Sequence, residues 1–199
     1  DWPQISKLPE IETLIDIGVG KEGTPLLYDR FPKAKLVLID PIEEAEQFAK
    51  NNLNGREYQF FKFGVGNKEE IKMLNIEEEI GRSTLLNVTS LNYEGDPKKK
   101  ITIEVKTLDN ICKNHNKYGK IGLKIDTEGY ELNIIKGAED KIKNINYIYF
   151  EHHFDDMLKK GYTFSEIHEY LIKNCFQKRL KLKMFFRKSF EYIYEKKFI

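Results

Sequence analysis

The sequence alternates short aliphatic runs with segments long enough to form helices, and this alternation limits the folds open to the chain. Most of the runs are rich in isoleucine, leucine and valine, and one, at 58–63, is aromatic; apolar runs of this length are typical of buried strands. Two of the intervening segments, 42–53 and 131–144, have the length and polarity of helices. The runs that we interpret as strands cover residues 13–17, 35–40, 58–63, 121–126 and 145–151.

Repeated strand and helix units predict one α/β domain over residues 1–199, with a mostly parallel sheet and helices on both faces. We expect residues 101–106 to add a strand to this sheet, followed by a short helix. After a helix at 163–174, period-two alternation predicts two last strands that end the sheet as an antiparallel pair. In sheets of this kind, ligands bind at the carboxyl ends of the strands.

Composition and charge argue against several classes of protein. Lysine and arginine number 33 against 32 aspartates and glutamates, so no charge imbalance favours nucleic acid or an anionic membrane as a partner. No apolar run approaches the roughly 18 residues of a membrane-spanning helix, and the first residues lack a signal-peptide pattern. Cys112 and Cys175 lie far apart in a chain that needs no disulfide framework. We therefore expect a soluble, cytoplasmic protein.

The first aliphatic run leads into a loop whose Gly18, Gly20 and Gly23 have the spacing GxGxxG. That spacing alone also fits a dinucleotide site. Asp16, at the carboxyl end of the first strand, changes the interpretation because its charge would repel a pyrophosphate and attract a ligand with an ammonium and a sulfonium. S-adenosylmethionine is such a ligand. We therefore expect this loop to bind S-adenosylmethionine, with a tight turn of no further role as the alternative.

Other cofactor contacts follow from the ends of the next strands. Gly18 and Gly20 would let the backbone approach the cofactor without a Cβ in the way. Asp40 would accept hydrogen bonds from both ribose hydroxyls, unless it only caps the helix that follows. Gly64 and Val65, after the third strand, are expected beside the adenine, although an ordinary strand end would have the same sequence.

The segment LKIDTEGYELNIIKGAE at 123–139 resembles the FkbM family of S-adenosylmethionine-dependent methyltransferases. The family's hallmark is a strand, an aspartate, one residue and then Glu-Gly-Tyr-Glu. It is matched by Asp126, Glu128, Gly129, Tyr130 and Glu131, and the likeness extends through VKTLDNI, YIYFE, LIDIGVGKEG and LVLIDP. The resemblance implies a Rossmann-like seven-stranded methyltransferase fold and methyl transfer to oxygen, often of sugars. The glycine loop departs from the family's more common Gly-Ala-Asn run, which leaves the acceptor open.

Methyl transfer from a sulfonium depends chiefly on alignment of the reactants, but an alcohol acceptor must also lose its proton. The groups near the strand ends are Asp126, Glu128, Glu151, His152 and His153. We predict His152 as the general base because histidine titrates near neutrality, with Glu151 as the second candidate. Asp126 is assigned to the cofactor site. Asp126 and Glu151 with a histidine could instead hold a divalent cation, but no tight ligand spacing is visible and no metal is predicted.

Two further segments have alternative interpretations. Turn-forming residues and a lysine run over 67–100 favour a solvated loop over a flap that covers the acceptor. These residues are Gly81, Ser83, Asn87, Gly95, Asp96, Pro97, Lys98, Lys99 and Lys100. In the tail at 178–188, basic and apolar residues alternate, which favours strands with lysines facing solvent over a surface for lipid or nucleic acid.

Three functional hypotheses follow. The favoured one is an O-methyltransferase that acts on a small-molecule or glycan acceptor, with no nucleic-acid partner. The second is a catalytically idle cofactor-binding or scaffold protein with the same fold. The third, an NAD(P)-dependent oxidoreductase, is disfavoured by Asp16 and by the segment IDTEGYE. Neither the acceptor nor the oligomeric state follows from the sequence.

Overall fold

The computed structural model describes residues 5–76, 83–86, 99–113, 119–154, 161–183 and 189–197. Parts of the two segments with alternative interpretations lie outside these ranges, so the flap and the tip of the basic tail stay predictions. The residues concerned are Gly81, Asn87, Gly95, Asp96, Pro97, Lys98 and 184–188.

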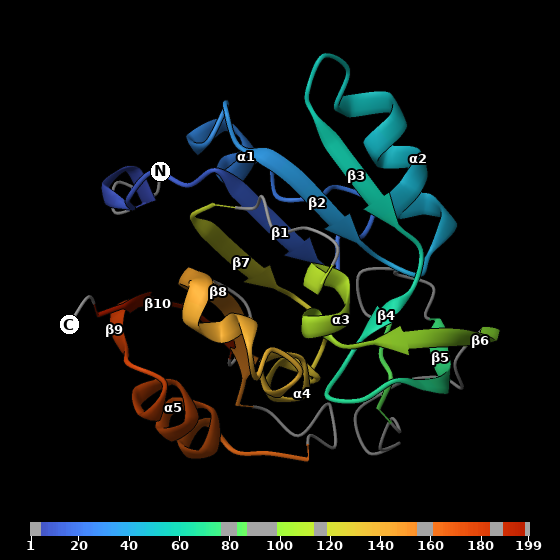
Figure 1. The fold of residues 1–199 in the computed structure, drawn as a ribbon. Coiled ribbons are helices and arrows are strands. Elements are labelled where there is room, and N and C mark those ends of the chain that lie inside the picture. Colours follow the sequence, from blue (N-terminus) through green and yellow to red (C-terminus); the bar gives the residue numbers. More distant parts are fainter. Residues whose placement is uncertain are drawn as a thin grey trace.

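Within the described residues, seven strands form one sheet in the order β3-β2-β1-β7-β8-β10-β9 (Figure 1). The first five strands of this order are parallel to one another. They are β3 (Tyr58–Phe61), β2 (Lys35–Ile39), β1 (Thr13–Ile17), β7 (Ile121–Ile125) and β8 (Ile145–His153). Every residue of β1 and β7 is buried, as their aliphatic sequences predict. The predicted α/β fold with a mostly parallel sheet is confirmed.

The last strand of the chain lies inside the sheet and not at its edge. β10 (Ser189–Lys196) pairs antiparallel with β8 on one side and with β9 (Phe176–Lys183) on the other. Its central residues, Tyr192 to Tyr194, are at most 1% exposed. The predicted antiparallel C-terminal strand is therefore confirmed, and β9 forms one end of the sheet.

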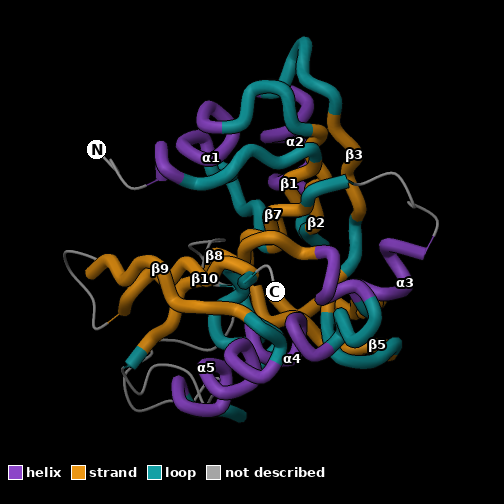
Figure 2. Tube along the Cα trace, turned by 60° about the vertical axis from the view of Figure 1, so that its left-hand side comes forward, coloured by secondary structure: helices purple, strands orange, loops and turns teal. Residues whose placement is uncertain are grey.

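Helices cover both faces of the sheet (Figure 2). α1 (Pro25–Arg30) and α2 (Glu43–Asn52) lie on one face, and α4 (Glu131–Lys136) and α5 (Phe164–Lys173) lie on the other. Alternate residues of each strand face opposite sides. Leu14 therefore packs in the cluster with Leu27 and Ala45, whereas Ile15 packs in the cluster with Ile134 and Ile167. No helix in the described part of the chain is long and apolar enough to span a membrane.

The predicted helix at 131–144 is divided. α4 ends at Lys136, and a separate 3₁₀ turn covers Lys141–Asn144. The division occurs at Gly137, where a Cβ would lie 2.1 Å from the carbonyl oxygen of Gly66. A side chain at this point would exclude the Gly66 backbone, so Gly137 permits a close contact between α4 and the segment after β4. By contrast, α5 begins where predicted, with a capping box formed by Thr163 and Glu166.

The prediction that residues 101–106 extend the main sheet is wrong. β6 (Lys99–Lys106) pairs instead with β4 (Gly64–Val65) and β5 (Glu70–Ile76), which form a second sheet in the described part of the chain. Leu74, Ile103 and Val105 of this small sheet pack against Ile42. Residues 70–76, which the sequence placed in a solvated loop, therefore form a strand with a buried face next to the carboxyl ends of β1 and β2.

Candidate active site

The glycine loop after β1 packs directly on the end of β7. Gly18 has φ of +81°, and a Cβ built on it would lie 1.8 Å from the carbonyl oxygen of Asp126. Gly20 also has a positive φ, +59°, but no atom lies within 4 Å of its Cβ position. Gly18 thus closes the loop against the sheet, whereas Gly20 leaves open space beside the backbone.

Asp40, which directly follows β2, ties the glycine loop to the start of α2. Its Oδ2 accepts a hydrogen bond from the Gly20 amide and its Oδ1 accepts one from the Ile42 amide, both at 2.9 Å. Each carboxylate oxygen keeps a second lone pair for a ligand. Burial raises the pKa of Asp40 to about 6, although the two amides oppose this shift. Asp40 does not cap α2, whose N-cap is Ile42 and has no side-chain cap hydrogen bond; it holds the amides of Gly20 and Ile42 and lines the cavity described next.

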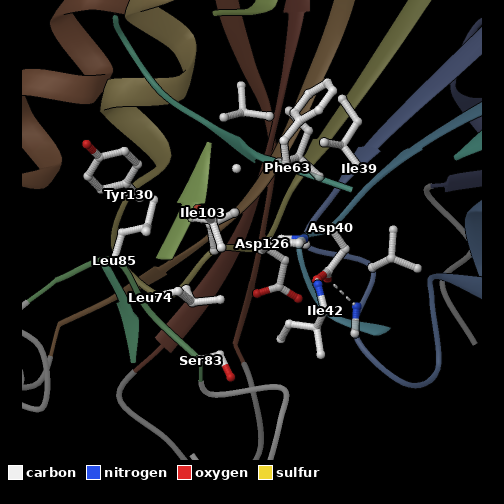
Figure 3. A pocket seen from close by; sticks show the side chains of 18 of the residues that line it. Ile39, Asp40, Ile42, Phe63, Leu74, Ser83, Leu85, Ile103, Asp126 and Tyr130 are labelled. Atoms are coloured by element: carbon white, nitrogen blue, oxygen red, sulfur yellow. Dashed lines mark hydrogen bonds between the residues drawn. The ribbon is translucent and has the colours of Figure 1, made fainter. Parts of the chain in front are cut away.

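A cavity of about 420 Å³ lies between the glycine loop, Asp40 and the small sheet, within the size range of small-molecule sites. Figure 3 shows Asp40 and Asp126 on one side and Leu74, Leu85 and Tyr130 on the other. The cavity therefore has a polar wall at the strand ends and an apolar wall from the small sheet. The other predicted cofactor residues that line it are Gly18, Gly20, Gly64 and Val65.

Asp16, in contrast, does not line the cavity. Its carboxylate is fully buried behind the loop, where Oδ2 accepts hydrogen bonds from Thr24 Oγ1 at 3.1 Å and from the Tyr28 hydroxyl at 2.5 Å. Its Oδ1 lies 3.1 Å from the Lys124 ammonium. The expectation that its charge faces the ligand is not met, because these three partners already surround the carboxylate. Asp16 instead supports the loop from behind.

Lys124 of β7 connects Asp16 to the cavity. Its ammonium donates a hydrogen bond to the Gly18 carbonyl at 3.0 Å and lies 3.6 Å from Asp126 Oδ2. Burial alone would lower the pKa of Lys124, but the attraction of Asp16 and Asp126 outweighs it and raises that pKa above its usual value. Asp126 is the carboxylate that faces the cavity, with 41% of its side chain exposed. Its place agrees with the assignment of Asp126 to the cofactor site.

The segment after Asp126 is held by its own glutamates. Glu131 accepts hydrogen bonds from the Gly129 amide at 2.9 Å and from the Tyr162 hydroxyl, and burial raises its pKa. Glu128 has φ of +51°, a conformation that costs a non-glycine residue free energy. Its carbonyl accepts a hydrogen bond from Thr84 Oγ1 at 3.0 Å. Hydrogen bonds from Thr84, Gly129 and Tyr162 thus fix the turn that leads from β7 into α4.

The end of β8 separates the two predicted bases. His152 faces α5, 4% exposed, with its ring 4.7 Å from that of Phe154 and 5.5 Å from that of Phe164. Glu151 and His153 lie on the other face of the strand, and His153 Nε2 is 3.5 Å from Glu151 Oε1 and 3.3 Å from Glu128 Oε2. The geometry favours Glu151 over His152 as the base, and both assignments stay predictions.

A comparison with protein families decides the broader identity. Residues 16–180 match the family model described as the methyltransferase FkbM domain. The chain belongs to the FkbM methyltransferase family. The predicted family and the predicted dependence on S-adenosylmethionine are thereby confirmed. No curated protein matches the sequence.

Solved structures confirm the Rossmann-like methyltransferase fold. A magnesium protoporphyrin IX methyltransferase from Synechocystis with bound S-adenosylhomocysteine has a TM-score of 0.53 at 10% identity, over 98% of this chain and 78% of that one. A putative S-adenosylmethionine-dependent methyltransferase from Listeria monocytogenes has a TM-score of 0.52 at 13% identity, over 98% and 97%. A putative tRNA (m1A22) methyltransferase from Streptococcus pneumoniae, in complex with S-adenosylmethionine, has 0.53 at 10%, over 98% and 71%. Such identities show the fold alone.

This FkbM-family chain uses residues at its site that sequence reasoning missed. Lys124 is the main one, and the signal was present, because a lysine in the otherwise apolar run IGLKI requires a buried partner. Leu74 was missed because residues 67–100 were expected to form a loop, and Ile103 because its strand was assigned to the main sheet. Among the described residues, no group of three or more histidine, cysteine, aspartate or glutamate side chains has an arrangement that could hold a metal ion.

Proposed function

We propose that the chain is a single-domain O-methyltransferase that acts on a hydroxyl of a small or sugar-derived acceptor. The observation that carries the proposal is the pair of carboxylates, Glu128 and Glu151, at the His153 imidazole, with Glu128 directly after the cavity-lining residues Asp126 and Thr127. Thr127 lines the cavity, Glu128 follows it directly, and both carboxylates lie within 3.5 Å of the same imidazole nitrogen. A hydroxyl must lose its proton during methylation, so proton-accepting groups at this point favour an oxygen acceptor.

The cavity suits S-adenosylmethionine by its volume and by the chemistry of its lining. Asp40 is suited to the ribose hydroxyls through its two remaining lone pairs, and Leu74 and Ile103 are suited to the adenine. Asp126 offers a carboxylate to the cationic end of the ligand, while the charge of Lys124 is already shared between Asp16 and Asp126. When bound, this cofactor supplies an electrophilic methyl group. The role of the protein is to align an acceptor oxygen with it and to receive the proton.

The acidic groups also support a polyhydroxylated acceptor. Glu151 and Glu191 lie opposite each other near the carboxyl end of β8 and the start of β10, and Glu128 and Glu151 lie at the same imidazole. Sugars offer hydroxyls in pairs, which suits carboxylates that accept more than one hydrogen bond. On this proposal the partner is a small molecule or glycan and not a nucleic acid, and the cytoplasm is the proposed location.

The proposed role of Asp40 predicts that cofactor affinity depends on pH. An ionised carboxylate accepts hydrogen bonds from both ribose hydroxyls, and protonation removes one of these acceptors. With a pKa of about 6, roughly one Asp40 in eleven is ionised at pH 5, so we expect the Kd for S-adenosylhomocysteine to rise about tenfold between pH 7 and pH 5. Titration calorimetry at the two pH values measures this. Asp40→Asn should bind more weakly with a flat profile, and a flat wild-type profile would contradict the assignment.

A thermal melt followed by an acceptor screen tests the function itself. At 100 times its Kd, a ligand stabilises by about 2.7 kcal/mol, which raises the melting temperature of a chain of this length by roughly 5–11 °C. We expect this shift with S-adenosylhomocysteine but not with NAD. Turnover is then screened with methyl-labelled S-adenosylmethionine and a panel of methyl glycosides, amino sugars and free amines. Methylation of amines alone would contradict an oxygen acceptor, and binding without turnover on any acceptor would favour the catalytically idle alternative.

A further inference from the structure

A strip of polar side chains lies on one face of β8 and β10, at the carboxyl end of β8. Tyr149, Glu151 and His153 alternate along β8, and in the antiparallel register Glu151 is opposite Glu191 and His153 is opposite Ser189. The Tyr149 hydroxyl donates a hydrogen bond to Glu191 Oε1 at 2.5 Å. Burying polar and charged groups costs free energy unless each is paired. A strip of this kind inside a sheet therefore indicates a role beyond packing.

His153 is the centre of this strip. Its Nε2 lies 3.3 Å from Glu128 Oε2 and 3.5 Å from Glu151 Oε1, so one ring nitrogen is shared by two carboxylates. The side chains differ in exposure, at 2% for His153, 8% for Glu128 and 16% for Glu151. Both distances are those of ion pairs, so a protonated His153 would attract the two carboxylates at once. Glu151 is the member of the three with the most access to solvent.

The backbone of Glu128 is held in place independently. Its φ of +51° is costly for a residue with a Cβ, and strain of this kind collects at functional sites. The hydrogen bond from Thr84, which is 1% exposed, fixes the Glu128 carbonyl from the other side. The turn after β7 therefore presents the Glu128 carboxylate to His153 in one arrangement.

We propose that His153 is a positioning residue that ties Glu151 to Glu128, and that Glu151 is the catalytic residue that takes the proton of the acceptor hydroxyl. This inference rests on the proposed O-methyltransferase function. In the step, the hydroxyl oxygen forms a bond to the methyl carbon while the bond from that carbon to sulfur breaks, and its electron pair stays with sulfur. The hydroxyl proton passes to a Glu151 oxygen. Nothing is oxidised or reduced, and no co-reactant is needed.

Charged groups from three elements surround this arrangement. Glu128 and Asp126 approach from the turn after β7, Glu191 from β10, and Lys124 from β7 itself. Burial raises the pKa of Glu191 to about 7, opposed by its hydrogen bond from Tyr149 and reinforced by Glu151. A change in the protonation of any of these groups changes the electrostatic environment of Glu151. The pH dependence of kcat in one protein therefore cannot be assigned to a single group, and profiles must be compared between variants.

An acceptor-independent test follows the His153 imidazole by NMR in protein labelled with ¹⁵N-histidine. The chain has only four histidines, so single substitutions assign their signals. We expect the His153 Nε2 signal to shift in Glu128→Gln and in Glu151→Gln. Glu195→Gln, on β10 and paired with Arg179, is the matched control and should leave it unchanged. If the chemical shift of His153 Nε2 is the same in Glu128→Gln and in Glu151→Gln as in the wild type, His153 does not connect the two carboxylates and the proposal is wrong.

A kinetic test shows whether His153 positions Glu151 or only fills space. It measures turnover with the hydroxyl acceptor that the screen identifies. Glu151→Gln should lower kcat by about 10²- to 10⁴-fold, with the Kd for S-adenosylhomocysteine unchanged within about twofold. His153→Phe keeps the ring volume without a donor, and His153→Gln keeps a donor at the Nε2 position. We expect kcat to fall about tenfold or more in the phenylalanine variant and to be largely restored in the glutamine variant. In a plot of kcat against pH, the low-pH side should be displaced only in the phenylalanine variant.

The outcomes distinguish this inference from the proposed function. If His153→Phe is as active as His153→Gln, the imidazole only fills space and the positioning role is wrong. If His152→Phe loses turnover while Glu151→Gln keeps it, the base is His152 and the inference is overturned. If the screen yields only amine acceptors, the O-methyltransferase proposal and the base role of Glu151 fail together, while the NMR result still decides whether His153 holds the two carboxylates.

Discussion

Lys124→Met is expected to lower the free energy of unfolding by about 3–5 kcal/mol. The substitution removes the ammonium 3.1 Å from Asp16 and leaves a carboxylate that is 0% exposed without its cation. Tyr28 and Thr24 still donate to that carboxylate, but neither carries a charge. Urea denaturation followed by circular dichroism measures the loss, and the cofactor affinity should fall as well because Lys124 also holds the Gly18 carbonyl.

Two controls make the Lys124 result specific to the buried pair. The double variant Asp16→Asn with Lys124→Met removes both charges and keeps an oxygen for Tyr28 and Thr24, so it should be more stable than Lys124→Met alone. Lys50→Met removes a lysine from an exposed pair with Glu46 and should change stability too little to measure. A loss below about 1 kcal/mol in Lys124→Met, or a double variant less stable than the single one, would show that the pair does not hold the loop.

Gly18→Ala is the second substitution with a large expected effect. The residue has φ of +81°, which costs an L-residue roughly 1–2 kcal/mol, and its Cβ would lie 1.8 Å from the Asp126 carbonyl oxygen. Relief of that overlap requires the loop to move away from β7 and adds about 1–3 kcal/mol. Because the loop and Asp126 both line the cavity, we expect the affinity for S-adenosylhomocysteine to fall at least about 100-fold, near 2.7 kcal/mol.

Gly20→Ala provides a matched comparison in the same loop. Its φ of +59° also favours glycine, but no atom lies within 4 Å of its Cβ position. We therefore expect only the conformational cost of roughly 1–2 kcal/mol in the free protein. Thermal and urea denaturation of the two variants side by side measure the difference. Equal destabilisation by Gly18→Ala and Gly20→Ala would mean that contact with Asp126 does not constrain the loop.

The sequence predicts the main sheet well because each strand carries its own signal. Runs such as 121–125, which are apolar apart from Lys124, must be buried on both faces, and this requires helices on both sides. The pairing of β6 was not predictable in the same way. Its alternating pattern shows that one face is buried, but the pattern is the same whether the partner is the main sheet or β5. Which strand becomes its neighbour is decided by contacts with residues that are far away in the sequence.

The site divides along similar lines. Asp40 and the glycines follow from local order, since they must lie where parallel strands end. The surroundings of Asp16 depend on Tyr28 and on Lys124, and Lys124 is more than one hundred positions away in the sequence. For this reason the sequence suggested that the Asp16 charge faces the ligand, whereas in the structure Lys124 neutralises it. The choice between His152 and its neighbours depends on which face of β8 each residue occupies. A shift of one residue in that register would reverse the answer.

The position of β10 affects how the protein is made. β9 precedes β10 in the chain but is joined to the rest of the sheet through β10, which pairs with both β8 and β9. Until β10 leaves the ribosome, two strand edges with unpaired amide and carbonyl groups are open to other chains. A chain interrupted before residue 189 would keep both edges open and would be a ready target for chaperones and proteases. The edge of β8 is therefore covered only once residues 189–196 have been synthesised.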